Sequence, residues 1–134
     1  MLEEFSNTKE LNYLKSKKYS ALIGNPTEHS ISDIMFSRMV ELFGLPFDYQ
    51  HVKINIQEDL LGYKLRELVK ENYSGFNITL PYKISVLKLL DRINSTAKAV
   101  GAVNTIKNDH NRLCGYNTDW CGIYQLLVNN NKDK

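Results

Sequence analysis

The stretch YSALIGNPTEHSIS, residues 19–32, contains the pattern that decides the fold. YSALI (19–23) is a compact run with strand character, and the Gly-Asn-Pro that follows breaks it into a loop. Ser32 then stands in a preferred N-cap position, ahead of apolar residues that recur every three to four positions. A strand that leads through a loop into an amphipathic helix predicts the first unit of an α/β fold.

The same alternation continues along the chain. FDYQHVKI (47–54) predicts a second strand, a leucine-rich amphipathic helix spans residues 60–69, and the start of GFNITLPYK (75–83) predicts a third strand. Connections of this length imply right-handed crossovers between parallel strands. We therefore expect an α/β three-layer sandwich, with a mostly parallel twisted sheet flanked by helices.

Shorter elements follow in the second half of the chain. Pro81 suits the first turn of a third helix, and a short helical piece is expected at 95–99. VNTIK (103–107) and RLCGY (112–116), separated by a turn-rich segment, predict a late hairpin. A last helix should begin near Asp119 and place its apolar side chains in the core.

The length of 134 residues suits one domain. We divide the chain into a polar lead-in with a weak helical stripe (1–18), a folded domain (19–128) and a linker-like tail (129–134). The N-terminus has no secretion signal, and no apolar run is long enough to span a bilayer. These features predict a cytoplasmic protein.

Charge and cysteine content argue against several classes of partner. A net charge of +2, spread along the chain, gives no electrostatic footprint for nucleic acid. Cys114 and Cys121 are too isolated from histidines to suggest a metal site, and we expect both to be buried and reduced.

Polar side chains gather where the predicted strands end. Ser30 and Ser32 follow the first strand near a helix N-terminus, where hydroxyls and free backbone amides suit an anion such as a carboxylate. Asn77 and Thr79 are two positions apart, so they point to one side of the third strand, and Lys83 follows them. Ligands of open α/β sheets bind outside the carboxyl ends of the strands. The sequence therefore predicts a small-molecule site there.

Four segments, in this order, resemble the N-terminal substrate-binding domain of the shikimate dehydrogenases. They are GNPTEHSIS (24–32), GFNITLPYK (75–83), AVGAVNT (99–105) and GYNTDWCG (115–122). In that family this domain binds shikimate or 3-dehydroshikimate, and a second, Rossmann-type domain binds NADP. The resemblance implies the reduction of 3-dehydroshikimate to shikimate by hydride transfer, in aromatic amino acid biosynthesis.

The resemblance also assigns substrate contacts. Ser30 and Ser32 match the serines that hydrogen-bond the substrate carboxylate, and Thr79 matches a further substrate contact. Asn104 matches an amide that grips the ring hydroxyls, while Asn77 supports the pocket.

Lys83 and Asp119 match the catalytic pair of the family. Ketone reduction needs a proton donor beside the developing alkoxide, and a lysine held near a carboxylate can donate that proton and stabilise negative charge.

Three positions depart from the family pattern. Asp33 stands where proline is usual, and an extra carboxylate beside an anion site should weaken substrate affinity. Phe36 and Trp120 are bulky residues where histidine and glycine are common. These departures leave open a relative that acts on quinate or an aminated analogue.

The sequence contains no glycine-rich G-x-G-x-x-G turn, and it ends where the family would begin its first Rossmann strand. We therefore expect no cofactor site on this chain, and no activity without the missing C-terminal NADP domain. A stand-alone, non-catalytic module that binds a small carboxylate is the alternative from another class. The oligomeric state stays open, with a homodimer as one alternative.

Overall fold

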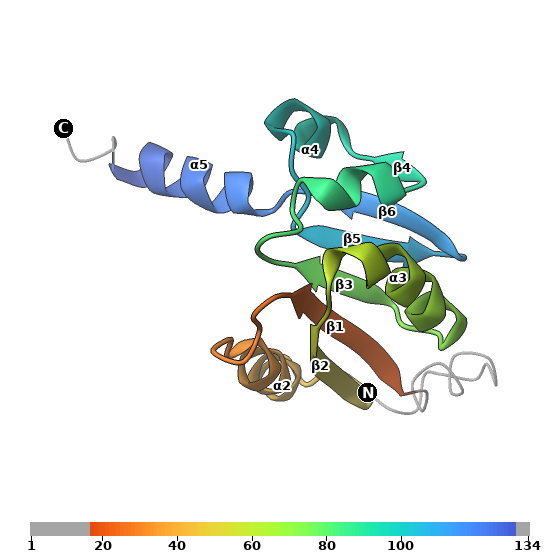
Figure 1. Ribbon diagram of the computed structural model, residues 1–134. Coiled ribbons are helices and arrows are strands. Elements are labelled where there is room, and N and C mark those ends of the chain that lie inside the picture. The colour runs from red at the N-terminus through yellow and green to blue at the C-terminus, as the bar shows by residue number, and fades with distance from the viewer. Residues whose placement is uncertain (1–16, 131–134) are drawn as a thin grey trace.

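The computed structural model describes residues 17–130, and the predictions for residues 1–16 and 131–134 lie outside this range. Figure 1 shows the arrangement of the elements. In chain order they are β1 (Lys18–Gly24), α2 (Ser32–Leu42), β2 (Tyr49–Asn55), η1 (Glu58–Leu60), α3 (Leu61–Lys70), β3 (Gly75–Ile78), η2 (Ser85–Leu89), β4 (Arg92–Ile93), α4 (Ser95–Val100), β5 (Thr105–Asp109), β6 (Arg112–Tyr116) and α5 (Asp119–Asn130).

The strands of the described range form one six-stranded sheet in the order β2-β1-β3-β5-β6-β4. β1 runs parallel to both β2 and β3, and β4 runs parallel to β6. β5 is antiparallel to its neighbours β3 and β6, so it alone among these strands runs against the rest. The predicted α/β class, the mostly parallel sheet and the late hairpin are confirmed.

The hairpin turns at His110 and Asn111, whose φ angles are 52° and 69°. Two-residue hairpin loops favour positive φ at both central positions, because that twist matches the twist of the flanking strands. Asn111 tolerates this conformation well, and its N–H donates to Oδ1 of Asn108 at 2.9 Å.

The hydrophobic core lies on the sheet face that α3 covers. Alternate strand positions point to this face and meet the apolar stripe of α3. The leucines and the valine of the stripe predicted at 60–69 are buried, except Leu60, which belongs to η1 and is 51% exposed. Side chains of η2 and α4 complete the layer. The main cluster contains Ala21, Ile23, Leu61, Leu65, Leu68, Val69, Phe76, Ile78, Tyr82, Val86, Ala97, Val103, Ile106 and Leu113.

Helix α2 lies on the opposite face, which gives the three layers. Its Phe36 packs against Tyr49 and His51 of β2, whereas Val52 and Ile54 of β2 pack against the core cluster on the other side. No residue of α2 is buried. The helical spacing of its apolar residues therefore does not place them in the core.

The helix predicted after Pro81 does not form as an α-helix. Residues 81–84 make turns, and only the 3₁₀ helix η2 follows. Tyr82 and Val86 are both buried, and the Tyr82 hydroxyl donates to the carbonyl of Ile56. These anchors hold the segment in a tight path, so Lys83 lies in a turn.

Helix α5 projects away from the sheet (Figure 1). Ile123 and Leu127, which the sequence placed in the core, are exposed, and so is Cys121. Cys114 is buried in β6, as predicted, but the prediction for Cys121 is wrong, because Cys121 lies on the projecting helix α5 and is exposed. Between residues 17 and 130, no helix is long and apolar enough to cross a membrane.

Candidate functional site

The loops after β1 and β3 touch at the carboxyl edge of the sheet. The N–H of Asn25 donates to the carbonyl of Leu80, and that of Thr79 to the carbonyl of Ile23, both at 3.0 Å. A Cβ on Gly24 would lie only 2.3 Å from Cγ2 of Thr79. Because glycine leaves this space free, Thr79 packs directly against the start of the loop that carries the two predicted serines.

Lys83, Asn104 and Asp119 come together from three separate segments. Lys83 Nζ donates to Asp119 Oδ2 at 2.6 Å, and Asn104 Nδ2 donates to Asp119 Oδ1 at 2.9 Å. Asn104 Nδ2 also donates to Thr118 Oγ1 at 2.8 Å, while its Oδ1 accepts the N–H of Thr118 at 2.8 Å. The side chains of Lys83 and Asp119 are 31% and 49% exposed. This ion pair is thus fixed in place yet reachable by a ligand.

Asp119 is held by the start of α5, where it is the first helical residue. An acidic residue in the first turn is favourable beside the free N–H groups of a helix. The buried Asn117 donates to the carbonyl of Ala102 at 3.1 Å and accepts the N–H of Trp120 at 3.1 Å. Trp120 packs edge-on against Tyr124, with ring centroids 5.1 Å apart.

Ser30 and Ser32 form the second group of the site. Ser30 Oγ accepts the N–H of Ser32 at 3.2 Å, so Ser30 satisfies one of the free amides at the start of α2. The predicted N-cap role of Ser32 is wrong, since Ser32 is already helical and Ile31 occupies the N-cap position. The Ser32 hydroxyl instead lies 3.2 Å from Nε2 of His51.

His51 is a buried residue of β2 whose ring contacts the Ser32 hydroxyl. Its Nδ1 lies 2.6 Å from Oγ of Ser20, and Phe36 stacks on its ring at a centroid distance of 4.4 Å. Burial lowers the pKa of His51 below its ordinary value of 6.5, against the opposing charge of Asp33. A neutral imidazole donates through one nitrogen and accepts through the other, so His51 can hydrogen-bond to Ser20 and Ser32 at once.

Asp33 is paired with a cation that the sequence interpretation overlooked. Lys53 Nζ lies 3.5 Å from Oδ2 of Asp33 and donates to the carbonyl of Ser30 at 3.0 Å. Burial acts to raise the pKa of Asp33, but the N–H of Ile34 and the charge of Lys53 outweigh it, so the pKa is lowered. The extra carboxylate at this helix start is charged and has a counterion.

Asn77 lies deeper on the α2 face of the sheet. It lines a cavity of about 290 Å³ whose wall includes Phe36, Tyr49 and Thr105. Thr105 is opposite Asn77 in the β3–β5 pairing, and its hydroxyl donates to Oδ1 of Asn104 at 3.2 Å. Through Thr105, the cavity adjoins the cluster formed by Lys83 and Asp119.

The sequence analysis missed His51 and Lys53. A signal for them exists, because Tyr49, His51, Lys53 and Asn55 put a polar group at every second position of β2. Such alternation predicts a strand with one apolar face and one polar face. Polar residues on a face that a helix covers indicate a site.

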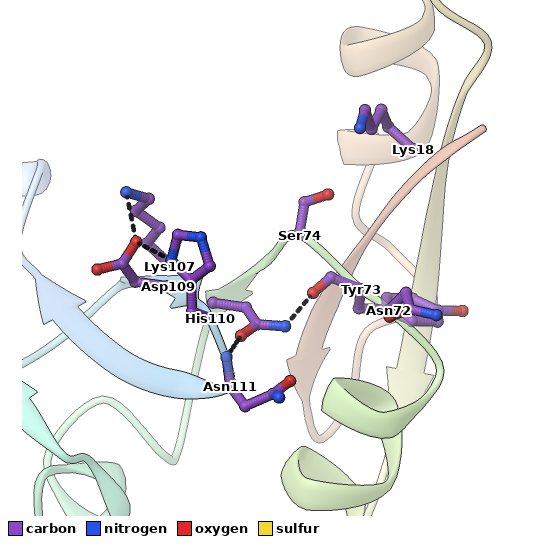
Figure 2. Close-up of a pocket in the computed structure, with 9 residues that line it drawn as sticks. Lys18, Asn72, Tyr73, Ser74, Lys107, Asp109, His110 and Asn111 are labelled. Atoms are coloured by element: carbon purple, nitrogen blue, oxygen red, sulfur yellow. Dashed lines mark hydrogen bonds and ion pairs between the residues drawn. The ribbon is translucent and has the colours of Figure 1, made fainter. Parts of the chain in front are cut away.

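A different cavity, of about 540 Å³, lies at the opposite end of the sheet (Figure 2). None of the predicted site residues line it. Lys107 is paired with Asp109 at 3.2 Å, and Asn108 donates to the carbonyl of Tyr73 at 2.8 Å. This cavity also lies away from the carboxyl ends of the parallel strands, where ligands of open α/β sheets bind.

Comparison with known proteins gives matches over most of the chain. The family model for the shikimate dehydrogenase substrate binding domain matches residues 22–106. Shikimate dehydrogenase (NADP(+)) of Methanococcus maripaludis is 38% identical over 110 residues, 82% of this chain and 39% of the relative. The crystal structure of shikimate 5-dehydrogenase from Thermus thermophilus with NADP(H) and shikimate has 32% identity and a TM-score of 0.77, covering 85% of this chain and 42% of that one.

A further match is 5-ketofructose reductase of a Gluconobacter strain, with 25% identity and a TM-score of 0.78, covering 85% of this chain and 40% of that one. The chain spans about two fifths of the length of the curated relatives it matches.

Proposed function

Since this chain belongs to the shikimate dehydrogenase family, through the substrate-binding domain that matches residues 22–106, we propose that its site on the α2 face binds shikimate and 3-dehydroshikimate. The observation that carries this proposal is the contact of Lys83 Nζ with Asp119 Oδ2 at 2.6 Å, in reach of Asn104. The complete protein would then catalyse the NADP-dependent interconversion of these two compounds.

The substrate carboxylate binds at the start of α2 in this proposal. The hydroxyls of Ser30 and Ser32 donate to its oxygens, in keeping with the preference of helix N-termini for anions. His51 keeps the Ser32 hydroxyl in position through the contact at 3.2 Å. Thr79 contacts the ring, because it packs against the loop that holds the serines.

The other end of the substrate ring lies at Lys83, Asn104 and Asp119. When the ketone is reduced, the developing alkoxide gains a proton from the Lys83 ammonium, which Asp119 holds in position. The positive charge beside the oxygen stabilises the transition state more than the neutral ketone, and this difference accelerates the reaction. Asn104 orients Asp119, and it binds a ring hydroxyl by exchanging its bond to Thr118 Oγ1 for one to the substrate. Asn77 supports the pocket.

The hydride for this reduction would come from NADPH, the reduced form of the cofactor named for the curated relatives, and this part of the chain does not fit that cofactor. A dinucleotide needs a glycine-rich turn with room for its pyrophosphate at a helix N-terminus. The loop between β1 and α2 contains Pro26, which lacks an N–H, and the space beside Gly24 is filled by Thr79. The residues of this chain are therefore proposed to bind the substrate and donate the proton.

A calorimetric titration of the chain with shikimate tests this proposal. We expect binding that weakens about tenfold or more in Lys83→Ala and in Ser30→Ala, because a hydrogen bond to a charged group contributes about 1.5–3 kcal/mol. Lys88→Ala is the matched control, since Lys88 is an exposed lysine of η2, five positions along the chain. It should bind like the parent.

Absence of binding at millimolar shikimate would count against the proposal. Binding of quinate or an aminated analogue in preference to shikimate would point to a relative that acts on one of those compounds. Binding without any effect of Lys83→Ala would favour a non-catalytic carboxylate module. The domain limits, the cytoplasmic location, a homodimer and the inactivity of the isolated chain stay predictions.

A further inference from the structure

Two charged side chains, Asp33 and Lys53, lie beside the two serines of the site. Asp33 lies in the first turn of α2, one position after Ser32. Its Oδ1 is inaccessible and accepts no hydrogen bond, so the ion pair through Oδ2 is its main charge partner here. A ligand carboxylate that reaches Ser30 and Ser32 therefore approaches a second carboxylate.

Lys53 is placed to offset this repulsion. Its side chain is 27% exposed and that of Asp33 38% exposed, so solvent screens the pair only in part. An ammonium has three N–H donors. One of them is donated to the carbonyl of Ser30, which is one of the two proposed carboxylate-binding residues, and the ammonium lies 3.5 Å from Oδ2 of Asp33.

We propose that Lys53 is a further substrate-binding residue, whose ammonium donates a remaining N–H to the substrate carboxylate and offsets the charge of Asp33. This inference rests on the proposed function. The Asp33–Lys53 pair then determines the preference of the site for a charged ligand over a neutral one. A site without a carboxylate ligand would not need a lysine here, because the two serines alone can bind neutral hydroxyls.

The test compares shikimate with its neutral methyl ester, using the full chain and amide NMR titrations. Lys53→Met should weaken shikimate binding about tenfold or more, because it removes a charge-assisted hydrogen bond and leaves Asp33 beside the ligand. Binding of methyl shikimate should change less than about threefold, since the ester has no charge. The ratio of the affinity for shikimate to that for the ester should therefore be lower in Lys53→Met than in the parent, by the ratio of these two effects.

Companion variants separate charge from structure. Lys53→Arg keeps the charge and should retain most of the affinity for shikimate. Asp33→Asn should bind shikimate more tightly than the parent, and adding Asp33→Asn to Lys53→Met should recover part of the lost affinity. Lys64→Met is the matched control, because Lys64 pairs with Glu67 on α3, on the other face of the sheet.

The inference is overturned if Lys53→Met binds shikimate as the parent does, or if it loses affinity equally for the ester. Should Lys53→Met fail to fold, Asp33→Asn decides the matter, since unchanged or weaker shikimate binding in that variant contradicts the role of the pair. If the parent binds no shikimate, the proposed function fails and this inference fails with it. If the parent binds shikimate and the pair has no effect, this inference alone fails.

Discussion

The two faces of the central sheet are built from the same strands and serve different ends. On the α3 face, Ala21 and Ile23 of β1 meet a helix that buries its apolar stripe. On the α2 face, Ser20 of β1 and His51 of β2 meet a helix that buries none of its residues. Both helices show apolar residues at helical spacing, so periodicity alone does not separate them.

The difference lies in what the strands present to each helix. Hydrophobic burial stabilises only where both surfaces are apolar, because buried polar groups must find hydrogen-bond partners. On the α2 face, Ser20, His51 and Ser32 pair with one another, and a cavity remains beside Asn77. One face therefore stabilises the domain, and the other holds the site.

The largest expected effect of this contrast is on stability. Leu65→Ala removes a side chain of α3 that is 0% exposed, and it should lower the free energy of unfolding by about 2–5 kcal/mol. Leu42→Ala on α2, where the leucine is 79% exposed, should change it by less than about 0.5 kcal/mol. Urea unfolding of both variants measures the difference. Equal losses would mean that α2 packs as part of the core.

A smaller effect should appear with pH, and only the α2 face should produce it. Because burial lowers the pKa of His51, the unfolded chain binds a proton first when the pH falls through 6.5. The free energy of unfolding should therefore decrease as the pH falls through 6.5 toward the folded-state value. His51→Gln should remove this slope, while Leu65→Ala should keep it. Denaturation series at several pH values between about 7.5 and 5.5 would measure it.

The pH prediction fails if the parent and His51→Gln show the same slope. The carboxylates with lowered pKa values, Asp33 and Asp91 among them, affect stability at lower pH, as they gain protons near and below 4. The interval above about 5.5 therefore isolates the histidine.

Much of the α3 face could be predicted from sequence, because a helix that packs on the core has apolar residues at regular helical spacing. Leu61, Leu65, Leu68 and Val69 follow the helical repeat and are all buried. The same reasoning failed for α2 and α5, since an apolar stripe does not say whether a partner covers it. The turn at Lys83 was also missed, because the anchoring of Tyr82 depends on a carbonyl far away in sequence.

The candidate site divides in the same way. The strand ends pointed to Ser30, Thr79 and Lys83, because parallel strands bring their carboxyl ends to one edge. His51 and Lys53 lie inside β2, and the sequence alone does not tell whether a polar side chain of a strand faces solvent or a helix. Only the position of α2 over β2 reveals that they face the proposed carboxylate end.

The most direct measurement is an amide NMR map of the chain titrated with shikimate. We predict saturable shifts in the loops around Ser30, Thr79, Lys83 and Asn104, with the α3 residues around Leu65 unmoved. This pattern would place the ligand on the α2 face, between the serines and the Lys83–Asp119 pair. Shifts confined to the hairpin end near His110, or no saturable shifts at all, would contradict the assignment of the site.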